Sequence, residues 1–201
     1  MMYPELAANL EALTDRFDEI TPERKALLLR LTDYVRTAER PVRLVAICTH
    51  NSRRSHFTQL GLMLAANFYG LIGVETYSGG TETTAFHPLA VAAVRDFGIR
   101  VVEEEPGSNP VYRLRTGPDA AAYRAFSKVY DAPPNPTTGF AAIMVCSEAD
   151  AGCPVVPGCE LRLPLPYDDP KVADGTDREA ATYDARLREI CRDMLYALGQ
   201  V

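Results

Sequence analysis

The stretch that decides the fold is Val42-Arg43-Leu44-Val45-Ala46-Ile47-Cys48-Thr49-His50-Asn51-Ser52-Arg53-Arg54-Ser55-His56. It begins with an apolar run of strand length, continues through small and polar residues, and leads into a segment with helical spacing. Five residues separate Cys48 from Arg54, and Ser55 follows directly. A loop between a strand and a helix can turn successive N–H groups inward, so this stretch predicts an anion-binding loop.

The residue types in this loop indicate chemistry on an oxyanion. The positive field of the loop favours the thiolate form of Cys48, and Arg54 can hold a tetrahedral oxyanion through two N–H groups. Ser55 is placed to donate a hydrogen bond to the thiolate. The alternative is a buried cysteine at a strand end followed by a surface arginine. The candidate oxyanion-binding residues are Thr49, His50, Asn51, Ser52, Arg53, Arg54 and Ser55.

At this stretch the chain resembles the low-molecular-weight protein tyrosine phosphatase fold family. The resemblance implies an α/β fold with an open, parallel four-stranded sheet flanked by helices. Two positions depart from the family. His50 stands where the family usually has glycine, and its side chain is expected to alter the loop mouth or the substrate preference. Arg53 stands where the family often has a second cysteine, and it either adds positive charge near the site or faces solvent.

A narrower resemblance comes from the second half of the chain. The apolar run Phe140 to Val145 predicts a buried parallel strand that ends at Cys146, and Cys153 follows seven residues later, directly before proline. The thioredoxin-coupled arsenate reductases, a branch of the same fold family, carry a second cysteine at a strand end and a third seven residues later. Farther on, Asp169 precedes Pro170 and falls on the family's general-acid position.

The resemblance implies a relay of three thiols. Cys48 attacks arsenate, Asp169 protonates the departing hydroxide, and Cys146 then attacks the Cys48 sulfur so that arsenite leaves. Cys153 carries the disulfide outward to thioredoxin, which requires the segment between Cys146 and Cys153 to move or unwind. The second hypothesis is a phosphatase with the same nucleophile, oxyanion binder and acid, in which water hydrolyses a phosphocysteine intermediate. The third is an anion- or phosphotyrosine-binding module without turnover.

The resemblance covers roughly residues 42–100 and 140–198. The chain is therefore expected to consist of an N-terminal extension and a phosphatase-like domain that contains an insertion. Residues 1–40 read as two amphipathic helices, with apolar residues such as Leu6, Leu10 and Leu13 at helical spacing, and are expected to pack on the core or to form a dimer interface. Residues 41–201 form the phosphatase-like domain, in which about 103–139 is an insertion that could be a hairpin or a lid. Pro133-Pro134-Asn135-Pro136 forbids regular structure within it.

Composition narrows the class of protein further. The chain has 201 residues, is 47% hydrophobic and carries a formal net charge of −6, which suits a globular domain and argues against nucleic acid or an anionic membrane as partner. No apolar run approaches the roughly 20 residues of a membrane span, and no signal peptide is evident, so a cytoplasmic location is expected. Its five cysteines are then catalytic, redox-active or buried. No dinucleotide motif or metal-ligand spacing predicts a cofactor.

Overall fold

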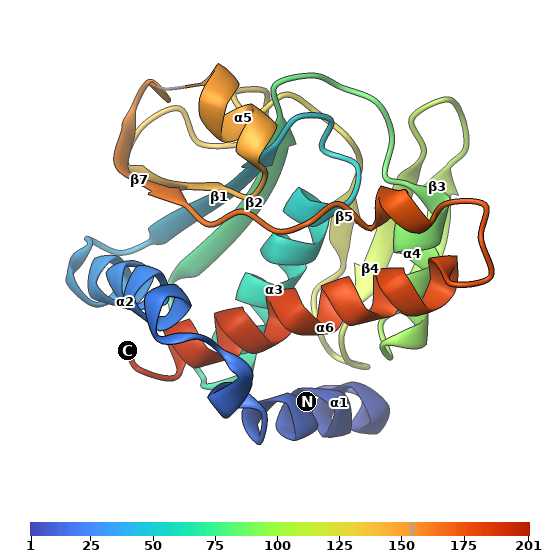
Figure 1. The fold of residues 1–201 in the computed structure, drawn as a ribbon, viewed down its shortest axis with the longest axis horizontal. Coiled ribbons are helices and arrows are strands. Elements are labelled where there is room, and N and C mark those ends of the chain that lie inside the picture. Colours follow the sequence, from blue (N-terminus) through green and yellow to red (C-terminus); the bar gives the residue numbers. More distant parts are fainter. Residues whose placement is uncertain (154) are drawn as a thin grey trace.

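A parallel four-stranded sheet forms the centre of the molecule (Figure 1). The computed structural model describes residues 1–153 and 155–201. The sheet has the strand order β2-β1-β6-β7, and every neighbouring pair is parallel. Its strands are β1 (Val42–Cys48), β2 (Val74–Gly80), β6 (Phe140–Met144) and β7 (Cys159–Pro164). The predicted fold class is confirmed, and the parallel direction places the carboxyl ends of β1 and β6 at one edge.

Helices flank this sheet, and its inner strands are apolar on both sides. β1 and β6 are almost wholly buried. Helix α6 crosses in front of α3 in Figure 1 and packs against it, with Tyr183, Leu187 and Ile190 buried between them and the rest of the core. The helices of this part are α3 (Arg54–Phe68), α4 (Pro88–Asp96), α5 (Ser147–Gly152) and α6 (Glu179–Leu198), with a short 3₁₀ turn η2 (Pro170–Ala173) before α6.

The N-terminal region forms two helices that lie along α6. They are α1 (Pro4–Thr14) and α2 (Pro22–Thr37), joined by the 3₁₀ turn η1 (Phe17–Glu19). The two helices expected within residues 1–40 are therefore present, and Thr21 caps α2 by accepting a hydrogen bond from the Arg24 amide. Leu6, Leu10 and Leu13 are buried in the core of the same chain, so these side chains are not free to form a dimer interface. Dimerisation through another surface stays a prediction.

Residues inserted between α4 and β6 form a second sheet. This antiparallel sheet contains β3 (Arg100–Glu105), β4 (Val111–Arg115) and β5 (Tyr123–Ala125) in that order. Glu103 to Glu105, expected to be a solvated turn, instead complete β3. After β5 the chain runs beside β2, where the Gly80 amide donates to the Lys128 carbonyl at 2.9 Å and the Tyr130 amide donates to the Gly80 carbonyl at 2.9 Å. The insertion therefore docks on the outer edge of the central sheet.

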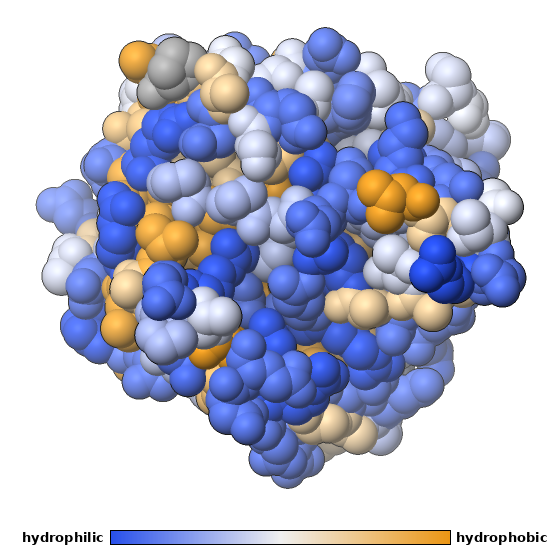
Figure 2. All heavy atoms as spheres, viewed as in Figure 1, coloured by the Kyte–Doolittle hydropathy of each residue, from blue (hydrophilic) through white to orange (hydrophobic). Residues whose placement is uncertain are grey.

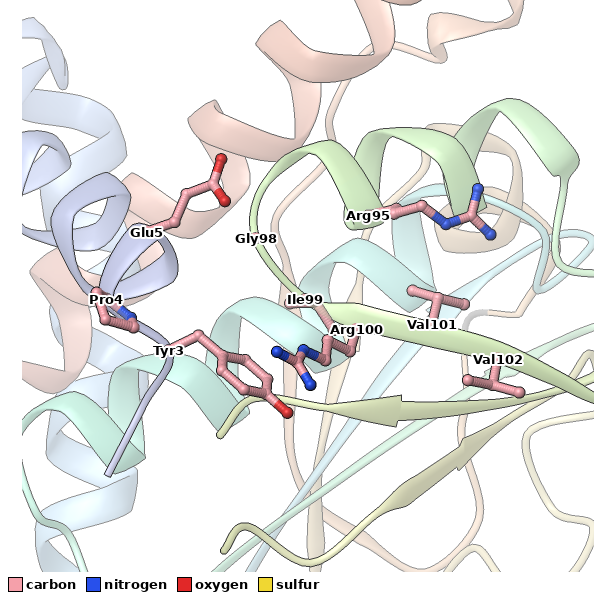
Figure 3. Close-up of a pocket in the computed structure, with 9 residues that line it drawn as sticks. All are labelled: Tyr3, Pro4, Glu5, Arg95, Gly98, Ile99, Arg100, Val101 and Val102. Carbon is pink, nitrogen blue, oxygen red and sulfur yellow. The ribbon is translucent and has the colours of Figure 1, made fainter. Parts of the chain in front are cut away.

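The surface is mostly polar. Figure 2 shows hydrophobic residues on this face as separate spots rather than one continuous patch. Within residues 1–153 and 155–201, no helix is both long and apolar enough to cross a membrane. A hollow of about 530 Å³ lies where the start of α1 meets the start of β3, and Figure 3 shows the Tyr3 ring beside the Arg100 guanidinium there.

Candidate active site

The candidate nucleophile lies at the end of β1 with a hydroxyl against its sulfur. Cys48 is only 4% exposed, and its Sγ is 3.0 Å from Ser55 Oγ in the first turn of α3. The same oxygen accepts a hydrogen bond from Asn51 Nδ2 at 2.9 Å. Because the Ser55 oxygen is already an acceptor towards Asn51, its own hydrogen is available for the sulfur. The Ser55 hydroxyl can therefore donate a hydrogen bond to the Cys48 sulfur.

The loop between β1 and α3 turns its carbonyl groups outward. Four of them accept hydrogen bonds from surrounding segments, which fixes the peptide planes. The bonds join Cys48 O to Thr81 N (3.1 Å), Thr49 O to Glu82 N (2.8 Å), His50 O to Thr84 Oγ1 and Ser127 Oγ (3.0 Å each) and Ser52 O to His87 N (3.0 Å). Asn51 has a φ of 44°, a left-handed conformation that asparagine tolerates better than most residues, and it reverses the chain inside the loop.

The N–H groups of this loop face the opposite way. Among the described residues, no backbone amide of residues 49–55 donates a hydrogen bond to a protein acceptor. Such a run of unpaired amides ahead of a helix N-terminus is an anion-binding concavity, since the helix dipole adds positive potential at the same point. Cys48 lies at the start of this loop, and binding of an oxyanion by residues 49–55 stays a prediction.

Arg54 is held at the loop by a carboxylate and a carbonyl. Its side chain is 9% exposed, Nη2 donates to Asp169 Oδ2 at 2.8 Å, and Nη1 donates to the carbonyl of Tyr167 at 3.0 Å. Asp169 also caps η2, where its Oδ1 accepts from the Lys171 amide at 3.0 Å. Arg54 and Asp169 are distant in sequence, yet the fold brings the predicted general acid into contact with the predicted oxyanion-binding arginine. The alternative of a surface arginine does not hold.

A cleft of about 500 Å³ opens above the loop. Its walls include Thr49, His50, Arg53, Arg54, Asp169 and Lys171. No residue of 103–139 lines this cleft, so the insertion does not form a lid over it. The His50 side chain is 50% exposed and lies 3.7 Å from Glu82 Oε2, at the cleft mouth. Asn51 and Ser52 are buried and contribute to the loop through their backbone, and Asn51 also through its side-chain amide.

Arg53 does not face solvent. Its Nε donates to Tyr183 OH at 2.7 Å, and its Nη2 lies 3.4 Å from Asp174 Oδ2. Tyr183 OH also donates to Asp174 Oδ1 at 2.8 Å, and burial raises the pKa of Tyr183 to about 12. His87 lies beside this group, and its pKa is lowered by burial and by the Arg53 charge. Arg53 therefore braces the loop against η2 and α6.

Cys146 lies next to the loop at the end of the neighbouring strand. The Val145 amide donates to the Ile47 carbonyl at 2.9 Å, which continues the pairing of β1 with β6. Cys146 is fully buried, its Sγ is 3.5 Å from Thr49 Oγ1, and it accepts a hydrogen bond from the Ala149 amide as the N-cap of α5. Cys146 therefore contacts Thr49, the residue that directly follows Cys48.

Cys153 lies at the other end of α5 and is partly exposed. It is the C-cap of this helix, and the Cys153 amide donates to the Ala149 carbonyl at 3.0 Å. Cys153 comes seven positions after Cys146, which corresponds to about 10 Å along a helix axis. A disulfide needs Cα atoms about 4.4–6.8 Å apart, so these two cysteines can be joined only after α5 unwinds. A six-residue helix with one buried residue is poorly stabilised and suits that requirement.

Several residues at the site were not singled out from the sequence. Tyr183 was expected only to fill the core, because it lies on the apolar stripe of α6, yet its hydroxyl binds Arg53. Lys171 also lines the cleft. It comes two residues after Asp169, and this closeness to the predicted general acid could have marked it as a site residue. Ser78 is buried, and its Oγ lies 3.5 Å from His56 Nδ1. Cys159 and Cys191 lie outside the cleft, and burial raises the pKa of Cys191 to about 12. Within the described residues, no cluster of side chains could hold a metal ion.

Comparison with known proteins supports this fold. No protein-family model matches the chain. A protein named arsenate reductase from Halalkalibacterium halodurans is 24% identical over 144 residues, which are 71% of this chain and 84% of that protein. A crystal structure of YwlE from Bacillus subtilis is 12% identical and covers 79% of this chain and 97% of its own, with a TM-score of 0.51. A second YwlE structure, described as an arginine phosphatase with a phosphorylated active-site serine, covers 79% of this chain and 95% of its own at 12% identity and a TM-score of 0.50. The chain has the fold of the low-molecular-weight protein tyrosine phosphatase family.

Proposed function

We propose that this protein reduces arsenate to arsenite through Cys48, Cys146 and Cys153, with thioredoxin as the reductant. The observation that carries the proposal is the position of Cys146 at the end of β6, where its Sγ lies 3.5 Å from Oγ1 of Thr49, the residue that follows Cys48. A phosphatase mechanism uses Cys48, Arg54 and Asp169 but has no use for a second thiol at this place. The 24% identical relative named arsenate reductase supports the same choice.

The first step uses the loop. Arsenate binds to the loop amides and to Arg54, which exchanges part of its pairing with Asp169 for the anion. The Cys48 thiolate attacks arsenic, and Asp169 in its protonated form gives its proton to the departing oxygen, which leaves as water. Arsenic is still pentavalent in the resulting thiol ester. Thr49 and His50 line the same cleft and shape the space around the bound anion.

The next steps move two electrons to arsenic. The Cys146 thiolate attacks the Cys48 sulfur, the sulfur–arsenic bond breaks, and its electron pair stays on arsenic, which leaves as arsenite. A disulfide between Cys48 and Cys146 remains. The Cys153 thiolate then attacks the Cys146 sulfur, which frees the Cys48 thiolate and leaves a disulfide between Cys146 and Cys153. The dithiol of thioredoxin reduces this disulfide, so one thioredoxin is oxidised for each arsenate.

Trapping the intermediate disulfides tests this order. Reduced protein is treated with arsenate without thioredoxin, quenched with a thiol-alkylating agent and digested for mass spectrometry. The wild type is expected to yield the Cys146–Cys153 disulfide, and Cys153→Ser the Cys48–Cys146 disulfide. Cys159→Ser, at a partly exposed cysteine on β7, is the matched control and is expected to behave as the wild type. Detection of only reduced cysteines after arsenate in both the wild type and Cys153→Ser would contradict the relay.

A phosphatase is the second candidate. It is favoured by one observation, the complete burial of Cys146 beneath Thr49 with its sulfur already accepting the Ala149 amide. In this candidate water hydrolyses a phosphocysteine at Cys48, and Asp169 acts first as acid and then as base. Turnover of 4-nitrophenyl phosphate that survives Cys146→Ser and Cys153→Ser, together with no arsenate reduction by the wild type, would select it. Tight phosphate binding with neither activity would select a binding module.

A further inference from the structure

A second cavity lies away from the cleft, between the outer edge of β2 and the insertion. Its volume is about 510 Å³ and it shares no lining residue with the active-site cleft. Its walls are mainly flat and apolar. They include Tyr77 of β2, Tyr123 of β5, and Phe126, Pro133 and Pro134 of the following segment. We call it the Lys128 cavity, after the lysine that also lines it.

Lys128 is a buried cation without a counter-charge. The residue is 7% exposed, and its ammonium makes no hydrogen bond or ion pair with any described residue. The Nζ atom lies 4.9 Å from the centre of the Phe126 ring. Burial lowers the pKa of Lys128 to about 8, so the amine is still largely charged at neutral pH. Leaving a buried charge unpaired costs free energy, which a bound anion would recover.

No side chain of the cavity wall supplies this missing anion. The cavity is lined by no carboxylate, and its other cation, Arg124, is already paired with Glu104 at 3.0 Å and with Glu105 at 2.5 Å. Asn135 also lines the cavity, and its Oδ1 is a buried acceptor with no partner among the described residues.

The backbone of Lys128 is fixed on two sides, so its side chain does not reach this position by accident. The Lys128 amide donates to Asn51 Oδ1 at 2.9 Å, and the Lys128 carbonyl accepts from the Gly80 amide at 2.9 Å. A lysine on a free loop would turn its ammonium to water. Here the main chain holds the residue against the sheet edge, so most of the side chain is buried and its ammonium lies at the cavity wall.

The hollow in Figure 3 is larger but lacks this feature. Its cations, Arg95 and Arg100, are exposed, and Arg100 is already stacked on Tyr3 at 4.4 Å. Water solvates these charges, so no bound anion is needed there. The two cavities therefore differ in their need for a bound anion because only one contains a buried, unpaired lysine, and not because of their volumes.

We propose that the Lys128 cavity binds a small organic carboxylate with a flat, apolar body. The Lys128 ammonium pairs with the carboxylate, and the body of the ligand packs between the Tyr77 and Phe126 side chains and the two prolines. A charge-assisted hydrogen bond to the ammonium gives such a ligand its selectivity over a neutral one of the same shape. The site is made largely by the insertion and does not depend on the arsenate chemistry proposed above.

Binding of matched probes to the full-length protein tests the proposal. Titration calorimetry compares benzoate and indole-3-acetate with their neutral amides, benzamide and indole-3-acetamide. The wild type is expected to bind at least one of the two carboxylates at least about tenfold more tightly than its amide. Lys128→Met, which keeps the length of the side chain and removes the charge, is expected to lose that difference. Lys25→Met, at a surface lysine of α2 far from the cavity, is the control and is expected to keep it.

Two further measurements separate this site from the anion loop and from a merely structural lysine. Carboxylate binding is expected to persist in Cys48→Ser and in the presence of inorganic phosphate, because the two sites share no residue. Lys128→Met is expected to melt at a higher temperature than the wild type, because it removes an unpaired buried charge. The proposal is overturned by competition between carboxylate and phosphate, by equal binding of carboxylate and amide, by no saturable binding of either carboxylate up to about 10 mM, or by a lower melting temperature of Lys128→Met.

Discussion

Ser55 connects the candidate nucleophile to the rest of the loop. Its oxygen receives the Asn51 side-chain amide and lies 3.0 Å from the Cys48 sulfur, and Asn51 in turn accepts the Lys128 amide. The chain of bonds runs from the insertion through the loop to the thiol. A hydrogen bond to a charged acceptor contributes more free energy than one between neutral groups. Removing the Ser55 hydroxyl should therefore affect mainly the thiolate form of Cys48.

Replacing Ser55 by alanine is therefore expected to slow alkylation of Cys48 by iodoacetamide at neutral pH. Loss of a hydrogen bond to an ionised group costs about 1.5–3 kcal/mol, so the rate should fall at least about tenfold. Thr58→Val removes another buried hydroxyl one turn later in α3, where it binds only the Arg54 carbonyl, and should leave the rate unchanged. An unchanged rate in Ser55→Ala would show that the hydroxyl does not stabilise the sulfur anion.

The buried charge of Lys128 predicts a pH dependence of stability. Burial lowers the pKa of Lys128 from 10.5 to about 8. Between these pH values the unfolded chain binds a proton that the folded chain has lost, so the folded state gains stability as pH rises through this window. The neighbouring His56 has its pKa lowered to about 3 by burial and by Lys128, and burial raises the pKa of Tyr77 and Tyr123, so none of them loses a proton near pH 8.

Urea unfolding of the wild type and Lys128→Met across this pH range checks the sign. The variant should be more stable than the wild type below about pH 8, and its advantage should shrink as pH approaches 10.5. The remaining cation of the wall, Arg124, is paired with Glu104 and Glu105 and stays charged throughout. If the stability difference between Lys128→Met and the wild type did not change with pH, the Lys128 amine would not be desolvated in the folded protein.

Among the elements, α5 lies between the second and third thiols of the proposed relay. The helix is tethered at its C-terminal end by Arg162 of β7, which donates to the carbonyls of Asp150 (2.7 Å) and Cys153 (3.0 Å). These bonds satisfy carbonyl groups that the end of a helix leaves unpaired. They also oppose the unwinding that the relay requires.

Arg162→Met is accordingly expected to speed the transfer of the disulfide from the Cys48–Cys146 pair to the Cys146–Cys153 pair. Removal of one or two bonds worth about 1 kcal/mol each should raise the single-turnover rate about 5- to 30-fold, measured by quenching at timed intervals. Arg43→Met, at a half-exposed arginine of β1 paired with Glu75, is the control. A slower transfer in Arg162→Met would mean that the ordered helix is needed for the step.

The whole molecule depends on α1 and α2 as a cover for α6. Leu10 of α1 is fully buried in the core of the chain, whereas Leu29 of α2 is 41% exposed. Apolar residues that leave water on folding contribute roughly in proportion to the area buried, so the N-terminal helices contribute to the stability of the domain and are not a detachable piece.

Leucine-to-alanine substitutions measure this contribution. Leu10→Ala is expected to lower the free energy of unfolding by about 2–5 kcal/mol, because it leaves a cavity against α6. Leu29→Ala, on the exposed side of α2, should change it by less than about 1 kcal/mol. Urea denaturation of both variants makes the comparison, and equal small losses would show that α1 is not part of the folded core.

Local patterns were enough to predict the central sheet and the loop. Cys48, Arg54 and Ser55 lie close together in sequence, so the spacing of strand, loop and helix determines where they meet. The pairing of Arg54 with Asp169 joins residues that are far apart in sequence, and only the resemblance placed them at one site. Lys128 was not found, because its burial depends on the docking of the insertion on β2, which no periodicity in residues 103–139 reveals.

The most direct test of the thiol relay is one pair of rates in two proteins. Arsenate-dependent oxidation of reduced thioredoxin and hydrolysis of 4-nitrophenyl phosphate are measured for the wild type and for Cys146→Ser. The relay predicts that the wild type reduces arsenate, and that Cys146→Ser loses at least about a hundredfold of this rate, near 3 kcal/mol, while any phosphate ester hydrolysis at Cys48 is kept. Full arsenate turnover by Cys146→Ser would contradict it.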